Sequence, residues 1–156
     1  MGTQLMPSSP LERARIDLFN ELFSSLITAP SISLLRNMGD EEAERKAREE
    51  LENGLRALDT FLLKNGSAQG GDYFLGGQFS MAEVMTGPFI LRRMVTHAEF
   101  CDFDFREVCE RHGLKRMLAW MEAVSQRPSL VETIPSDEEL FDGTRSMMQM
   151  LKGVSK

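Results

Sequence analysis

Apolar residues recur every three or four positions along most of the chain, which is the spacing of amphipathic helices. Ser9, Pro10 and Glu12 form a helix start, because serine caps, proline suits the first helical position and glutamate can bond back to the cap backbone. We expect this helix to run to about Ala29, where Pro30 ends it. The same spacing and signals predict further helical segments over residues 31–38, 40–65, 80–95, 103–112, 114–125, 128–133 and 136–152.

The first helix carries two apolar stripes rather than one. The first stripe consists of Leu11, Ala14, Leu18 and Leu22, and the second of Ile16, Phe19, Phe23 and Ile27. A helix that is apolar on two faces is either deeply buried in its own domain or pressed against a partner surface. We expect the leucine stripe to anchor the helix to the bundle and the two phenylalanines to face a partner.

The predicted helix over residues 40–65 has one apolar face and one charged face. Its apolar positions are Ala43, Ala47, Leu51, Leu55, Leu58 and Leu62. On the other face, acids precede bases by four residues in the pairs Glu41–Arg45, Glu42–Lys46 and Glu44–Arg48. Such a run of alternating charge indicates a solvated face and needs no functional explanation.

The next helix is predicted to be the most buried one. Phe79, Ser80, Glu83 and Val84 fit a capping box with a hydrophobic staple, and few polar residues follow. Pro88 should kink this helix. The glycine-rich stretch before it, over residues 67–71, lacks the Lys and Ser/Thr of a phosphate-binding loop. Because no segment shows the alternation of a strand, we predict an all-α bundle around one kinked central helix.

Composition excludes several classes of protein. A length of 156 residues fits one domain, and 42% hydrophobic and 27% charged residues are ordinary for a globular chain. The net charge of −6 argues against nucleic-acid binding, which needs clustered cations. We find no signal peptide and no apolar run near the length of a membrane span. Two cysteines are too few for a disulfide framework, which favours a reducing, cytoplasmic setting.

The residues offer little chemistry of their own. His97, Cys101, Cys109 and His112 form the only metal-like grouping, but their spacing matches no usual zinc pattern. The cysteines have apolar neighbours and are expected to behave as small buried hydrophobes. We therefore predict no metal site and no catalytic residue in this chain. The many methionines are typical of a plastic core, although a pocket for varied apolar ligands is an alternative.

The segment over residues 73–83, from Tyr73 through the capping Ser80 to Glu83, resembles the entry to the buried helix of the glutathione transferase C-terminal domain. Glu83 stands where that family usually has Asp, and it closes a capping box equally well. Further resemblances, closest to the omega class, cover most of the chain: residues 5–7, Pro10, residues 13–14, residues 20–24, Pro88–Phe89, residues 114–121 and residues 127–130.

This resemblance implies a helical domain over residues 9–156, preceded by a linker or residues added for expression over 1–8. In complete family members a thioredoxin-like half binds glutathione and activates its thiol, and the helical half builds an apolar pocket for the electrophile. Here the chain starts at the linker, as a truncated protein or a natural lone domain. Glutathione is thus expected as the co-substrate of a full-length protein and not as a ligand of this chain alone. The expected partners are a thioredoxin-like domain or a second copy, with no nucleic acid and no membrane.

The resemblance also suggests substrate-binding residues: Phe19, Phe23, Arg92, Leu140 and Phe141. Each has a structural alternative, since the first two can be core, Arg92 a surface charge and Leu140 the staple of its helix. A second function remains open, because similar domains join proteins in translation factor and aminoacyl-tRNA synthetase complexes without catalysis.

Overall fold

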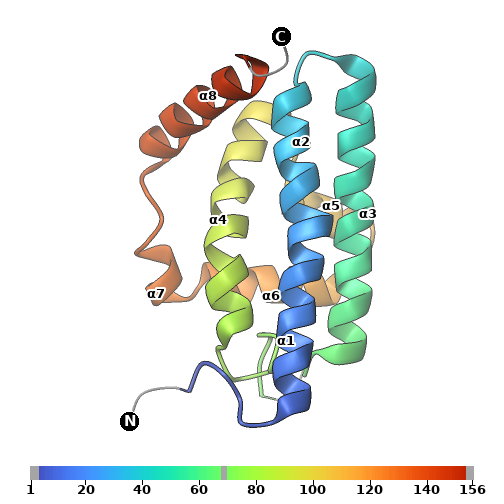
Figure 1. Cartoon of the computed structure of the whole chain (residues 1–156), viewed down its shortest axis with the longest axis vertical. Coiled ribbons are helices and arrows are strands. Elements are labelled where there is room, and N and C mark those ends of the chain that lie inside the picture. The colour runs from blue at the N-terminus through green and yellow to red at the C-terminus, as the bar shows by residue number, and fades with distance from the viewer. Residues whose placement is uncertain (1–3, 68–69, 154–156) are drawn as a thin grey trace.

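The computed structural model of the chain describes residues 4–67 and 70–153, which form eight α-helices and one π-helical turn. In Figure 1 the first three elements form one rod, with α3 on one side and α4 on the other. The all-α fold predicted from the sequence is confirmed. The elements are α1 (Pro10–Phe23), η1 (Ser24–Thr28), α2 (Ala29–Asn37), α3 (Glu41–Asn65), α4 (Met81–Cys101), α5 (Phe105–Arg111), α6 (Lys115–Ser125), α7 (Pro128–Val131) and α8 (Asp137–Gly153).

The first helix continues through Pro30, so the predicted end at Ala29 was wrong. A π turn precedes the proline, and the N–H of Ala29 donates to the carbonyl of Ser24. In an α-helix the N–H of residue 30 would donate to the carbonyl of Leu26, but proline has no N–H. That carbonyl instead abuts Gly54 of α3, where any Cβ atom would overlap the Leu26 oxygen. The glycine thus lets the two backbones approach at the point where the helix lacks a hydrogen bond.

The expected roles of the two stripes on α1 are reversed. Phe19 has no exposed surface and Phe23 is 2% exposed, whereas Leu11 and Leu18 are 60% and 49% exposed. Phe19 packs against Phe74 and Trp120 with ring centroids 5.1 and 5.7 Å apart, in the aromatic centre of the core. Both stripes have helical spacing, but the aromatic stripe carries the larger apolar surface, and its burial gains more free energy.

Helix α3 matches its prediction closely. Asp40 caps it, accepting a bond from the N–H of Ala43, and its leucine face is buried at Leu51, Leu55, Leu58 and Leu62. The charged face is solvated, with partners that differ from those expected. Only the Glu44–Arg48 pair forms as predicted, while Arg45 bonds Glu42 and Glu49, and Lys46 lies near Glu50.

A buried carboxylate joins three parts of the fold. Glu83, at the third position of α4, accepts bonds from the N–H and the hydroxyl of Ser80, both at 3.0 Å, which closes the predicted capping box. Its other oxygen accepts bonds from the N–H of Phe74 at 2.7 Å and from Trp120 Nε1 on α6 at 3.0 Å. The carboxylate is fully buried, and four donors satisfy it. The start of α4, the preceding loop and α6 are therefore held by one side chain.

Arg116 on α6 fastens the same loop from its other side. Its guanidinium donates to the carbonyls of Asp72 and Tyr73, each at 2.7 Å, and of Ser67 at 3.3 Å. Burial lowers the pKa of this arginine. The loop that resembled a family motif in sequence is thus a hydrogen-bonded structural element.

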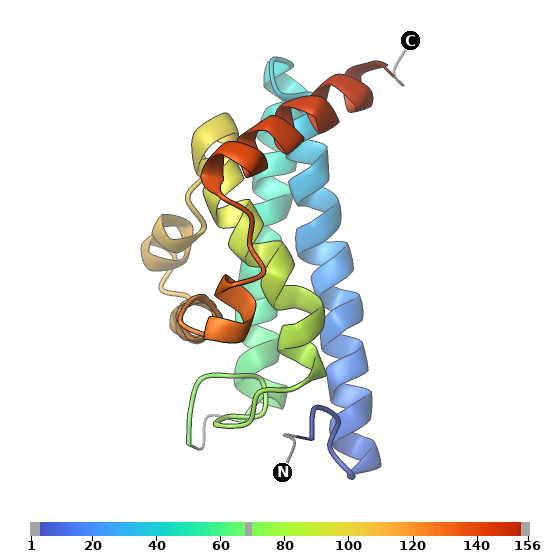
Figure 2. The ribbon, with the colours of Figure 1, turned by 90° about the vertical axis from the view of Figure 1, so that its left-hand side faces the viewer.

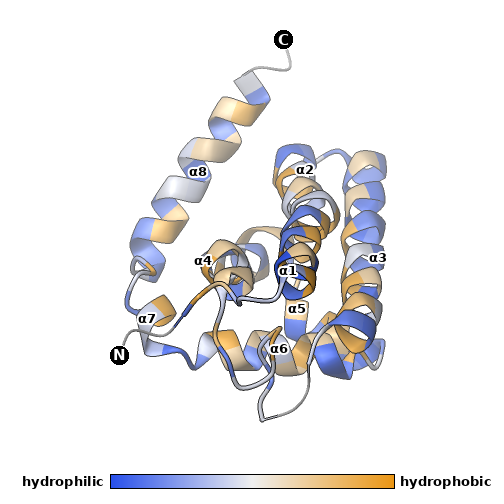
Figure 3. Ribbon diagram, turned by 60° about the horizontal axis from the view of Figure 1, so that its bottom comes forward, coloured by the Kyte–Doolittle hydropathy of each residue, from blue (hydrophilic) through white to orange (hydrophobic). Residues whose placement is uncertain are grey.

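The last helices lie around α4, whose interior holds Pro88. Gly87 brings α4 close to Leu130 of α7, so that a Cβ atom there would lie 2.7 Å from a leucine methyl carbon. Ser136 and Glu139 form the capping box predicted for α8, with both reciprocal bonds present. Figures 2 and 3 show α8 at the edge of the bundle, crossing beside α4. Its buried residues are Leu140 and Thr144, so α8 covers the bundle with a narrow strip.

The continuous helix over residues 10–37 is long and apolar enough, by length and composition, to cross a membrane. The expectation that no segment approaches this length was wrong, because it assumed a helix end at Pro30. Core helices pass the same test, and the apolar residues Ile16, Phe19 and Ile27 of this one are fully buried in the bundle.

Candidate functional site

A groove between α4 and α8 brings together two of the residues suggested by the sequence. It encloses about 210 Å³, and both Arg92 and Leu140 line it. The remaining lining residues are Phe89, Arg93 and Thr96 from α4, and Glu139, Gly143, Thr144 and Met147 from α8. The groove exists because α8 contacts the bundle only through its narrow buried strip, and Gly143 adds no side chain on its wall.

The α4 wall of the groove carries two adjacent cations. Arg92 is exposed, and Arg93 is half-buried with its guanidinium carbon 5.0 Å from the centre of the Phe89 ring. Arg93 Nε is buried without a hydrogen-bond partner, and burial together with the charge of Arg92 lowers the pKa of Arg93. Among residues 4–67 and 70–153, neither arginine forms an ion pair. Positive charge on this wall is therefore not neutralised within the described fold.

A second hollow lies on the other side of Phe89, against α1 and η1. It encloses about 270 Å³ and includes Phe23, whose ring meets that of Phe89 edge-on at 6.0 Å. Asn20 Oδ1 is buried beside it without a hydrogen-bond partner. The remaining lining residues are Ser24, Thr28, Met85 and Thr86. Phe89 thus separates two hollows, each with one unsatisfied buried polar atom.

The other two suggested residues lie elsewhere. Phe19 is sealed in the aromatic core, so its expected place on an open face was wrong. Phe141 lies on α8 and packs edge-on against Phe100 with ring centroids 5.7 Å apart. Neither is among the residues that line the two hollows. Sequence reasoning missed Phe89 and Arg93 as a pair, although their spacing of four on one helix was a visible signal of contact.

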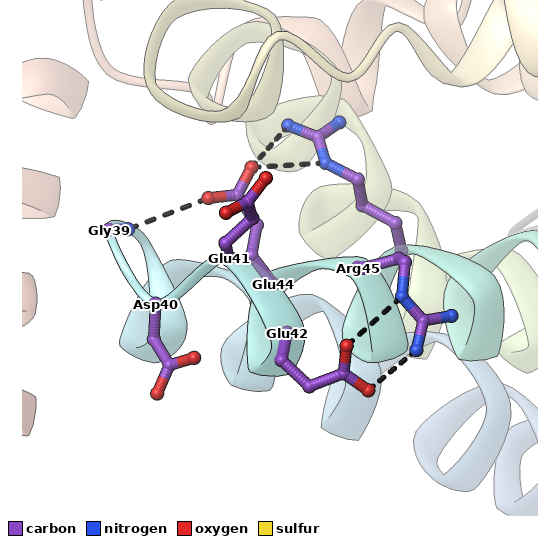
Figure 4. A pocket seen from close by; sticks show the side chains of 7 residues that line it. Gly39, Asp40, Glu41, Glu42, Glu44 and Arg45 are labelled. Carbon is purple, nitrogen blue, oxygen red and sulfur yellow. Dashed lines mark hydrogen bonds and ion pairs between the residues drawn. The ribbon is translucent and has the colours of Figure 1, made fainter.

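The largest hollow is a shallow, acidic surface where α3 begins (Figure 4), with a volume of about 760 Å³. Its charges are already paired within the helix. Glu42 bonds Arg45 at 2.6 Å, and Glu44 bonds Arg48 at 2.9 Å and accepts from the N–H of Gly39 at 3.5 Å. These pairs leave no convergent free group, so we assign no function to this surface.

The cysteines and histidines are structural in this arrangement. Burial raises the pKa of Cys101 to about 11 and that of Cys109 to about 12, so both stay as thiols near neutral pH. Burial lowers the pKa of His97 to about 4, and its Nε2 lies 2.9 Å from Ser31 Oγ. His112 lies 2.8 Å from Glu52 at the surface. In the part of the chain that the structure describes, no three His, Cys, Asp or Glu side chains gather as a metal site.

Comparison with known proteins identifies the fold. Residues 36–123 match the family of glutathione S-transferase C-terminal domains, which is more than half of the chain. A similar solved structure is Leishmania TDR1, described as a unique trimeric glutathione transferase, at 26% sequence identity and a TM-score of 0.74. The alignment covers 92% of this chain and 30% of that chain. No curated protein sequence matches the chain.

Proposed function

We propose a function on the premise that this chain belongs to the glutathione S-transferase C-terminal domain family, as its match over residues 36–123 shows. The chain is the electrophile-binding and dimerisation domain of a glutathione transferase-like protein. The full-length form conjugates glutathione to a small apolar molecule or transfers it, and does so in the cytoplasm. The single observation that carries this proposal is the open groove between α4 and α8, because it lies on a domain of this family and has an apolar lining.

Within this proposal, the residues divide the work between apolar contact and charge. Phe89, Leu140 and Met147 offer apolar surface to the electrophile, and Arg92 lies at the exposed side of the same groove. Phe23 supports the site from the neighbouring hollow through its contact with Phe89. Phe141 holds the start of α8 against Phe100 at the end of α4, and thereby fixes the opposite wall.

The chemistry on glutathione belongs to another domain in this proposal. Both thiols of this chain are buried and have raised pKa values, so neither is a thiolate nucleophile. The glutathione-binding partner is a thioredoxin-like domain. The exposed leucines of α1, Leu11 and Leu18, and Met85 at 60% exposure are apolar surface available to that domain or to a second copy.

The experiment compares the chain alone with the product of the complete open reading frame. The chain alone should show no conjugation of glutathione to 1-chloro-2,4-dinitrobenzene above the blank, and the complete protein should show it. In the complete protein, Leu140→Ala should raise KM for the electrophile and leave KM for glutathione unchanged. Arg145→Gln, an exposed position of α8, is the matched control. Turnover by the chain alone, or an inactive complete protein that still joins other proteins, would favour a different enzyme or the non-catalytic interaction module.

A further inference from the structure

The two arginines on the α4 wall of the groove are costly to place together. Arg92 and Arg93 are adjacent in sequence and both line the same hollow. Like charges in a partly desolvated place repel, and a buried guanidinium atom without a hydrogen-bond partner carries an unmet desolvation cost. A bound anion would relieve both effects at once.

The carboxylates near the groove do not supply that anion. Glu139 is the acidic residue of the lining, and both its bonds from the N–H and the hydroxyl of Ser136 are used in the cap of α8. Asp142 on the same helix is held by Arg145 at 2.8 Å. Thus the acids that α8 presents near its start are engaged in local bonds, and the described residues leave Arg92 and Arg93 unpaired.

The rest of the groove is suited to an apolar body. Phe89 lies under the Arg93 guanidinium, and Leu140 and Met147 come from the facing helix. The volume of about 210 Å³ holds a small organic molecule and no folded segment. An arginine backed by an aromatic ring presents its planar donors edge-on, which matches the two oxygens of a carboxylate.

We propose that the α4–α8 groove selects small amphipathic anions, in which a carboxylate or sulfonate meets Arg92 and Arg93 and an apolar body lies against Phe89, Leu140 and Met147. This inference rests on the proposed function, whose apolar pocket it narrows from apolar molecules in general to anionic ones. Arg93 sets the position of the anion because Phe89 holds its guanidinium, and Arg92 adds charge at the open side.

The experiment measures binding of octanoate and octanol to the purified chain by ligand-observed NMR, since these molecules share an apolar tail and differ in charge. Octanoate should bind at least about tenfold more tightly, a difference of about 1.4 kcal/mol. Arg93→Gln should reduce this preference to about twofold or less and leave octanol binding unchanged. Arg127→Gln is the matched control, because Arg127 also lies over an aromatic ring, Phe79 at 4.4 Å, but outside the groove.

Each outcome decides the proposal. Equal binding of octanol and octanoate to the parent chain overturns anion selection and leaves the apolar pocket of the proposed function intact. A preference that survives Arg93→Gln, or that disappears in Arg127→Gln, places the anion elsewhere and also overturns it. Binding of neither molecule counts against the groove as a ligand site and leaves the activity of the complete protein as a separate measurement. If Arg93→Gln melts early, Arg93→Lys retains the charge and should retain most of the preference.

Discussion

Replacing Glu83 should reveal how much of the fold depends on one buried carboxylate. In the native structure its two oxygens accept four hydrogen bonds, of which three come from N–H groups of Ser80, Phe74 and Trp120. The Glu83→Ala change leaves these three donors in a buried space without an acceptor. Each buried unsatisfied donor costs about 1–3 kcal/mol, so the total loss is about 3–9 kcal/mol. A domain of this size has only about 5–15 kcal/mol of stability, and Glu83→Ala should bring it close to unfolding.

Glu83→Gln is therefore the variant that permits measurement. It keeps the volume and one carbonyl oxygen, but places an NH₂ group opposite donors on one side, and should lower the free energy of unfolding by about 2 kcal/mol. Urea unfolding followed by far-UV circular dichroism gives the value without relying on the fluorescence of Trp120. Glu99→Gln, at an exposed site on the same helix, is the control and should change stability by less than about 0.5 kcal/mol.

Combining Glu83→Gln with Trp120→Phe tests the reasoning further. The two side chains share a hydrogen bond of 3.0 Å, so their effects should be non-additive by about 0.5 kcal/mol or more. The reasoning is refuted if Glu83→Gln is no more destabilising than Glu99→Gln, because the donors would then have other acceptors.

Three further predictions concern the core. The pKa of His97 is lowered from 6.5 to about 4, so below about pH 6.5 the unfolded chain takes up a proton that the folded chain does not, and stability should fall by up to about 3 kcal/mol as pH drops to about 4; urea titrations should show a flatter profile for His97→Gln. Gly54→Ala should lower stability by at least about 2 kcal/mol, and Gly143→Ala, in a helix with open space, should raise it by up to about 1 kcal/mol, as thermal melts can show. Phe19→Ala should lose about 3–5 kcal/mol in urea unfolding, and Leu18→Ala less than about 0.5; similar losses would contradict their burial.

The helices were predictable because their signals are local. Ser80 with Glu83, Asp40, and Ser136 with Glu139 are caps readable within four residues of sequence, and the structure uses all of them. What the sequence could not show is which of two equally spaced stripes on α1 faces the core. That choice depends on rings from distant segments, such as Phe74 and Trp120, which surround Phe19.

The candidate site was predictable only in part for a similar reason. Arg92 and Leu140 came from a family resemblance, and the structure places both in one groove. The groove itself arises from the separation of α4 and α8, which are joined by α5, α6 and α7 and whose distance no local pattern records. Arg93 was missed because its importance lies in the partners it lacks, and such an absence becomes visible only once every neighbour is in place.

The contact between Leu26 and Gly54 has a consequence for how this domain can change over evolution. Pro30 leaves the Leu26 carbonyl without its helical donor, and the carbonyl lies where only a residue without a side chain fits. A larger residue at position 54 would require the rod of α1, η1 and α2 to move away from α3. Positions 30 and 54 are therefore expected to covary among homologous domains, with proline at the first accompanied by glycine at the second.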